Sequence, residues 1–143
     1  MVATPAKPLP SWLEGKKLNK IEQNKANKDG LLVGSEIEEF ARVGWENVDE
    51  TDLQLRLKWY GMFWRPKTPG LFMLRLRVPN GVLNAEQLRA IGSIVARYGD
   101  SGSADITTRQ NIQLRGVLLE DLPDILERLK GVGLTTIQSA VDN

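Results

Sequence analysis

The chain has 143 residues, and its 41% hydrophobic and 26% charged content is typical of a globular domain that can bury a core. Its 19 basic and 18 acidic side chains leave a formal net charge of +1, which argues against a general nucleic-acid binder. The absence of cysteine and histidine excludes disulfides, thiolate or imidazole metal sites and histidine acid–base catalysis within this chain.

Residues 1–17 show no hydrophobic periodicity, and we expect a mobile lead-in there. The opening MVATPAKPLP lacks the apolar core of a secretory signal. No apolar run anywhere approaches the roughly 18 residues that span a membrane. These features favour a cytoplasmic protein without a membrane span.

Residues 18–70 are expected to form a helical and extended arm. LNKIEQNKANK predicts a marginal polar helix, and Ser35 with Glu38 has the spacing of a capping box that begins a second short helix. Alternating apolar side chains over residues 55–64 predict a strand or strand-like arm. Its aromatic residues are expected to pack in a core or between domains rather than to stack bases.

Charge in this arm is arranged in blocks. Seven acidic side chains lie between Glu36 and Asp52, and none lies from Leu53 to Ala85, where six basic residues occur. One interpretation is a pair of solvated, oppositely charged surfaces; the other is a positive basin that holds an anionic cofactor or meets an acidic partner. Arg56 belongs to that basic block.

The pattern of residues 71–143 predicts one α+β unit. The expected elements are, in order, a strand at 71–78, a helix at 84–98, strands near 103–107 and 112–117, a helix beginning at Asp121, and a strand at 134–140. Asn84 is expected to cap the first helix together with Gln87, and Asp121 to cap the second. The order βαββαβ predicts the ferredoxin-like, split βαβ fold, with both helices on one face of an antiparallel sheet.

The first helix of this unit is expected to bury one apolar stripe. Its members are Leu88, Ile91, Ile94, Val95 and Tyr98.

The free face of that sheet is the candidate site. In FMLRLRVPNG, Arg75 and Arg77 alternate with apolar residues, and in ADITTRQNIQLRG the odd positions from Asp105 to Arg115 are polar. If both segments share a sheet, four guanidiniums converge on the side away from the helices, with Arg109 presented by a turn at 108–111. A solvated outer face would give the same alternation, but planar Arg, Asn and Gln side chains favour bidentate binding of carboxylate or phosphate groups.

Four segments carry a family resemblance. In chain order they are DETDLQLRLKWYGMFWRP, FMLRLRVPNG, TTRQNIQLRG preceded by GSADI, and the closing VGLTTIQSAVDN. In these motifs, over about residues 24–143, the chain resembles the ferredoxin-dependent nitrite reductases of oxygenic phototrophs, relatives of the sulfite reductase haemoproteins. The resemblance implies six-electron reduction of nitrite to ammonia in nitrate assimilation, with reduced ferredoxin as partner. It also implies a siroheme linked to a [4Fe-4S] cluster held by four cysteines.

Because the chain has no cysteine, it resembles only the amino-terminal part of such an enzyme, and we expect it to be inactive without the remainder of the polypeptide. By the resemblance, Arg75 acts on the small anion. The residues implied to face the siroheme are Arg77, Thr107, Thr108, Arg109, Gln113 and Arg115.

Three alternatives remain open. One is a fragment of an assimilatory sulfite reductase. A second is an RNA-binding module, since such domains share the βαββαβ order; they stack bases on sheet aromatics, whereas the two inner strands here offer only Phe72, on the apolar face. A third is a regulatory domain that binds a small anion without catalysis.

Overall fold

Four short strands form one antiparallel sheet in the computed structural model, which describes residue 11 and residues 14–139. The strands are β1 (Met62–Phe63), β2 (Phe72–Leu76), β3 (Asp105–Ile106) and β4 (Ile112–Val117), and their spatial order is β1-β2-β4-β3. Side chains along β2 alternate between buried and half-buried, as a strand with one covered face requires. The α+β sheet predicted from the sequence is therefore confirmed.

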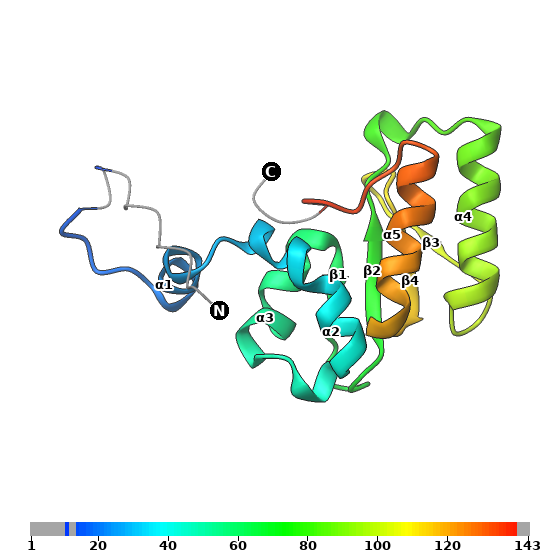
Figure 1. Ribbon diagram of the computed structural model, residues 1–143. Helices are drawn as coiled ribbons and strands as arrows, with labels where there is room; N and C mark the ends of the chain where they lie inside the picture. The colour runs from blue at the N-terminus through cyan, green and yellow to red at the C-terminus, as the bar shows by residue number, and fades with distance from the viewer. Residues whose placement is uncertain (1–10, 12–13, 140–143) are drawn as a thin grey trace.

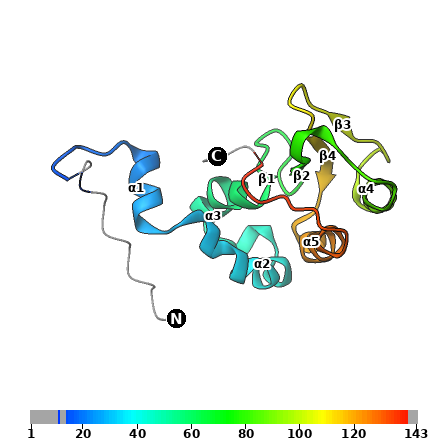
Figure 2. The ribbon, with the colours of Figure 1, turned by 90° about the horizontal axis from the view of Figure 1, so that it is seen from above.

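Two helices, α4 (Ala85–Tyr98) and α5 (Leu122–Gly131), lie side by side on one face of this sheet (Figures 1 and 2). α4 begins with the expected capping box, in which Asn84 Oδ1 accepts from the Gln87 backbone N–H and Gln87 Oε1 accepts from the Asn84 N–H. Ile91, Ile94 and Val95 are buried against the core. Leu88 was expected in this stripe but is 58% exposed, because it lies on the outer side of the first turns.

The start of α5 differs from the expectation. The Asp121 side chain accepts no capping hydrogen bond within the described part of the chain, because a 3₁₀ turn over Leu119–Asp121 leads directly into the helix and gives Asp121 helical dihedral angles. Pro123 occupies the first turn, and Leu122, Ile125 and Leu129 are buried.

The segment before the sheet is mainly helical. It contains α1 (Lys20–Asn27), α2 (Ile37–Val43) and α3 (Glu50–Gln54), with 3₁₀ turns over Gly30–Glu36, Trp45–Asn47 and Arg56–Tyr60. Ser35 does not cap α2; its hydroxyl donates to the Leu32 carbonyl inside a 3₁₀ turn. Gly44 ends α2 with a φ of 81°.

The predicted strand over residues 55–64 is wrong for most of its length. Arg56–Tyr60 forms a 3₁₀ helix that ends at Gly61, and only Met62–Phe63 pairs with β2. A strand and a helix could each bury the apolar side chains of this segment. Arg56, however, lies one helical turn after Asp52 and pairs with it, which favours the helix. The aromatic run packs within the chain: Trp59 is buried, and the Trp64 ring lies 5.4 Å from Trp45 and 5.6 Å from Phe72.

The last predicted strand is reduced to one bridge between Thr135 and Arg77. The reason is that Gly61, just before β1, already accepts the Arg75 N–H at 2.9 Å, so the returning chain cannot extend along β2. The returning chain instead continues beside the 3₁₀ helix over Arg56–Tyr60, where the Gln138 N–H donates to the Trp59 carbonyl. The expected end of this strand at Ala140, and most of the predicted lead-in, lie outside the described residues.

Among residue 11 and residues 14–139, no helix is both long and apolar enough to cross a membrane. The division of the chain at residue 71 stays a prediction; β1, from the segment before it, adds a strand to the same sheet.

Candidate anion-binding site

One side of the sheet carries no helix of the described residues (Figure 2). We call the side chains on this side the open face; they are those of Phe63, Met73, Arg75, Arg77, Asp105, Gln113 and Arg115. Strand pairing sets Arg75 directly opposite Gln113, and Gln113 directly opposite Asp105, so these three lie in one row across the sheet. Arg115 lies opposite Met73 in the next row.

A β-bulge fixes this register. Phe72 pairs with Val117 and Met73 with Arg115, so Gly116 is the extra residue on β4. Gly116 has a φ of 73°, and a Cβ there would lie 2.4 Å from the Asp100 Cβ. Only glycine fits this position comfortably, and the extra residue returns Val117 to the buried face, opposite Phe72.

A path of hydrogen bonds crosses the open face. The Arg75 Nη2 donates to Gln113 Oε1 at 3.3 Å, and Gln113 Nε2 donates to Asp105 Oδ2 at 3.5 Å. Arg115 Nε donates to the same carboxylate oxygen at 3.0 Å. The Arg115 hydrogen bond, followed by that of Gln113, holds the pKa of the Asp105 carboxyl below its usual range, so Asp105 is ionised near neutral pH.

Arg75 keeps donor capacity for a ligand. Its guanidinium carbon lies 5.0 Å from the centre of the Phe63 ring, a cation–π contact that holds the side chain in place. Its Nε is buried and has no hydrogen-bond partner among the described residues. Because a buried, unsatisfied donor of a cation is costly, an anion at this position would be favoured.

The other predicted residues lie further along the same side. The Arg77 Nη1 donates weakly to the Ile137 carbonyl at 3.4 Å. A turn links β3 to β4. The Thr107 N–H donates to the Asn111 carbonyl, and the Asn111 N–H donates to Thr107 Oγ1. Asn111 Oδ1 accepts the N–H of Val78, two residues beyond β2. Thr108 and Arg109 are exposed on this turn, as expected for a turn that presents Arg109.

The structure thus brings Arg75, Gln113 and Arg115 together and places Arg77, Thr107, Thr108 and Arg109 at the rim. Two further participants, Phe63 and Asp105, were absent from the predicted site. Asp105 was already on the polar side of its segment, and its spacing of ten residues from Arg115 was the signal available. Phe63 could not be found, because the predicted strand placed it on an apolar side.

The positive basin proposed from the charge blocks does not include Arg56. Arg56 is buried; its Nη1 lies 2.6 Å from Asp52, and other guanidinium nitrogens donate to the carbonyls of Asn24 and Lys28. Lys28 lies 2.8 Å from Asp52 and 2.5 Å from Glu36. Burial alone would lower the pKa of Lys28, but the hydrogen bonds and charges of Asp52 and Glu36 outweigh it and raise that pKa. This network ties α1 to α3.

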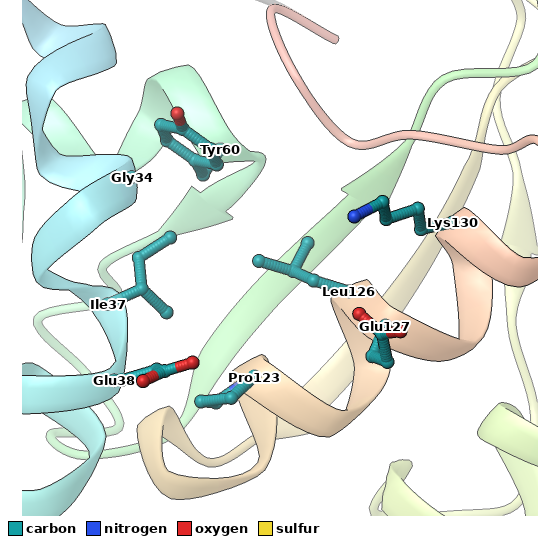
Figure 3. A pocket seen from close by; sticks show the side chains of 8 residues that line it. All are labelled: Gly34, Ile37, Glu38, Tyr60, Pro123, Leu126, Glu127 and Lys130. Atoms are coloured by element: carbon teal, nitrogen blue, oxygen red, sulfur yellow. The ribbon is translucent and has the colours of Figure 1, made fainter.

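A cleft of about 190 Å³ lies on the helical side, between α2 and α5 (Figure 3). Its lining includes the apolar Ile37, Pro123 and Leu126 and the charged Glu38, Glu127 and Lys130. None of the predicted site residues lines this cleft, so it is separate from the open face.

Comparison with known proteins identifies the unit that carries the open face. Residues 65–132 match the family described as the nitrite/sulfite reductase ferredoxin-like half domain. Over 127 residues the chain is 59% identical to the ferredoxin-nitrite reductase of Synechococcus elongatus, covering 89% of this chain and 25% of that relative. Residues 65–132 are therefore a nitrite/sulfite reductase ferredoxin-like half domain.

The chloroplastic ferredoxin-nitrite reductase of Spinacia oleracea is 45% identical over 134 residues, with 88% of this chain and 23% of the relative covered. In structure, the chain is similar to the Mycobacterium tuberculosis NirA protein, with a TM-score of 0.81 and 32% identity, covering 90% of this chain and 27% of that one. The half-domain family and fold predicted from the motifs are confirmed. The chain spans about a quarter of the length of the curated relatives that it matches.

Proposed function

We propose that this chain supplies the anion-binding face of a ferredoxin-dependent nitrite reductase, as its amino-terminal part. The complete enzyme would reduce nitrite to ammonia with six electrons from reduced ferredoxin. The observation that carries the proposal is the buried, unpartnered Nε of Arg75 on an inner strand of the open face. The names of the relatives supply the reaction.

Arg75 is proposed to bind the small anion. β2 is paired on both sides, with β1 and β4, so the Arg75 backbone is held rigidly, and Phe63 and Gln113 limit its side chain. A planar, permanently charged fork in this position can hold an oxyanion and stabilise the negative charge that develops as N–O bonds break.

The cofactor residues are proposed along the remainder of the open face and the turn. Those that would hold the carboxylates of a siroheme are Arg77, Thr107, Thr108, Arg109, Gln113 and Arg115. They fit such a group because they donate hydrogen bonds from a surface that the helices leave uncovered, and Arg109 and Arg115 are exposed. Together with a [4Fe-4S] cluster, whose cysteine ligands are absent from this chain, the siroheme would pass electrons from reduced ferredoxin to the bound anion.

A sulfite reductase is the nearest alternative, because the half-domain family covers enzymes of both names. An RNA-binding role has less support: Phe63 is the aromatic ring of the open face, and the Arg75 guanidinium lies over it. A cytoplasmic location remains a prediction that no structural observation tests.

The test compares nitrite reduction by the complete reductase with that by the 143-residue chain alone. With reduced ferredoxin, the complete enzyme should form ammonia, and its rate should exceed its rate with sulfite. The 143-residue chain with reduced viologen should show no reduction above a haem-free blank, because it has no cysteine for the cluster or its bridge. A complete enzyme that preferred sulfite would support the alternative function, and activity in the chain alone would refute its predicted inactivity.

A further inference from the structure

Asp105 is the one carboxylate among the open-face side chains as defined above. Its Oδ2 accepts hydrogen bonds from both Arg115 and Gln113. Gln113 in turn lies between Asp105 and Arg75 in the same row of the sheet. Asp105 therefore connects to the proposed substrate residue through a single side chain.

The position of Asp105 fixes the orientation of the Gln113 amide. An ionised carboxylate only accepts hydrogen bonds, so Gln113 turns its NH₂ group toward Asp105 and leaves its carbonyl oxygen for the Arg75 Nη2. The opposite orientation would set NH₂ against guanidinium and oxygen against carboxylate, and both contacts would be repulsive. Through Gln113, Asp105 thus holds the Arg75 fork in one direction and leaves its Nε unpaired.

Asp105 also limits the positive charge of the open face. Three sheet arginines and Arg109 on the turn would attract a divalent anion about twice as strongly as a monovalent one, since the Coulomb energy scales with the ligand charge. A fixed negative charge among them repels the divalent anion twice as strongly. It therefore shifts the preference of the open face toward the monovalent anion.

We propose that Asp105 is a specificity-determining positioning residue, which orients Arg75 through Gln113 and favours a monovalent oxyanion such as nitrite over a divalent one such as sulfite. This inference rests on the proposed function. It assigns Asp105 no contact with the substrate.

The experiment measures kcat/KM for nitrite and for sulfite in the complete reductase at mildly alkaline pH, where sulfite is mainly divalent. Asp105→Asn should raise the sulfite-to-nitrite ratio by about three- to tenfold. The change should fall mainly on KM, because Asp105 acts on binding. Asp105→Glu restores the charge and should return the ratio to within about twofold of the unmodified enzyme.

Asp124→Asn is the matched control. Asp124 also accepts an arginine Nε–H, from Arg128 at 2.7 Å, but on the exposed side of α5. Its replacement should leave the ratio unchanged.

An unchanged ratio in Asp105→Asn, in an enzyme that still reduces nitrite and still shows its siroheme absorption, would overturn the inference and leave the proposed function intact. The same holds if Asp124→Asn shifts the ratio equally, because the effect would then be one of general surface charge. Failure of the unmodified enzyme to reduce nitrite would instead overturn the proposed function, and this inference with it.

Discussion

Arg75 and Gln113 face each other across the central strand pair of the sheet, and the Arg75 Nη2 donates a 3.3 Å hydrogen bond to Gln113 Oε1. This pair joins the two motifs that are far apart in the chain, FMLRLRVPNG and TTRQNIQLRG. It depends on the strand register, which the bulge at Gly116 sets. The chemistry of the open face therefore rests on backbone geometry as well as on charge.

Gly116→Ala tests that dependence. The substitution should lower the free energy of unfolding by about 1–3 kcal/mol, because alanine resists the positive φ and its Cβ would collide with Asp100. Urea denaturation measures the change. Gly92→Ala, in the middle of α4 with open space around it, is the control and should raise stability by about 0.5–1 kcal/mol. Equal effects of the two variants would contradict the structural role of Gly116.

Asp52→Ala tests the buried network that joins α1 to α3. The variant should lose about 3 kcal/mol or more of unfolding free energy, because it leaves the buried Arg56 guanidinium without its carboxylate. Glu39→Ala breaks an exposed pair with Arg42 and should leave the unfolding midpoint nearly unchanged. A loss in Glu39→Ala that matched the loss in Asp52→Ala would show that burial is not the cause.

The titration of Asp105 offers a test by pH. Its pKa lies below the usual range, so the stabilisation from the Arg115 pair is present at neutral pH and is lost as the pH falls through the folded-state pKa. In a ¹³C NMR titration, Arg115→Ala should move the Asp105 midpoint up toward its ordinary value. Arg128→Ala, which removes an arginine from α5, should not move it. An Asp105 midpoint that is the same with and without Arg115 would refute the pairing.

Much of the half domain could be predicted because its local signals agree with its tertiary contacts. The Asn84 and Gln87 pair caps α4 as its spacing indicates, and period-2 alternation in β2 and β4 places Arg75, Gln113 and Arg115 on one side. The segment before the sheet could not be predicted equally well. There a 3₁₀ helix or a strand could each bury Leu57 and Trp59. The contacts of Arg56, with Asp52 one turn earlier and with the distant Lys28 carbonyl, decide between them.

In the candidate site, too, some residues could be predicted from the sequence and others could not. The arginines follow from the pattern of one strand at a time, whereas Asp105 and Phe63 acquire their roles from neighbours on other strands. A single sequence shows which face a residue takes but not which residue lies opposite. The cross-strand neighbours are set by the strand register, which shifts at a bulge. A glycine in the sequence does not by itself predict a bulge.

Arg75 is proposed to act on the substrate anion and Arg109 on the cofactor. In the complete reductase, Arg75→Lys keeps the charge but loses the planar fork, so nitrite turnover should fall about ten- to a hundredfold, the equivalent of one charged hydrogen bond.

Turnover and siroheme absorption, measured together in Arg75→Lys and Arg109→Ala, test this claim most directly. Arg42→Lys on the exposed side of α2 is the control for arginine replacement. Arg75→Lys is expected to keep the siroheme spectrum and lose turnover, whereas Arg109→Ala is expected to lose siroheme content. Arg75→Lys protein that purifies without siroheme, or that reduces nitrite with unchanged kinetics, would contradict this claim.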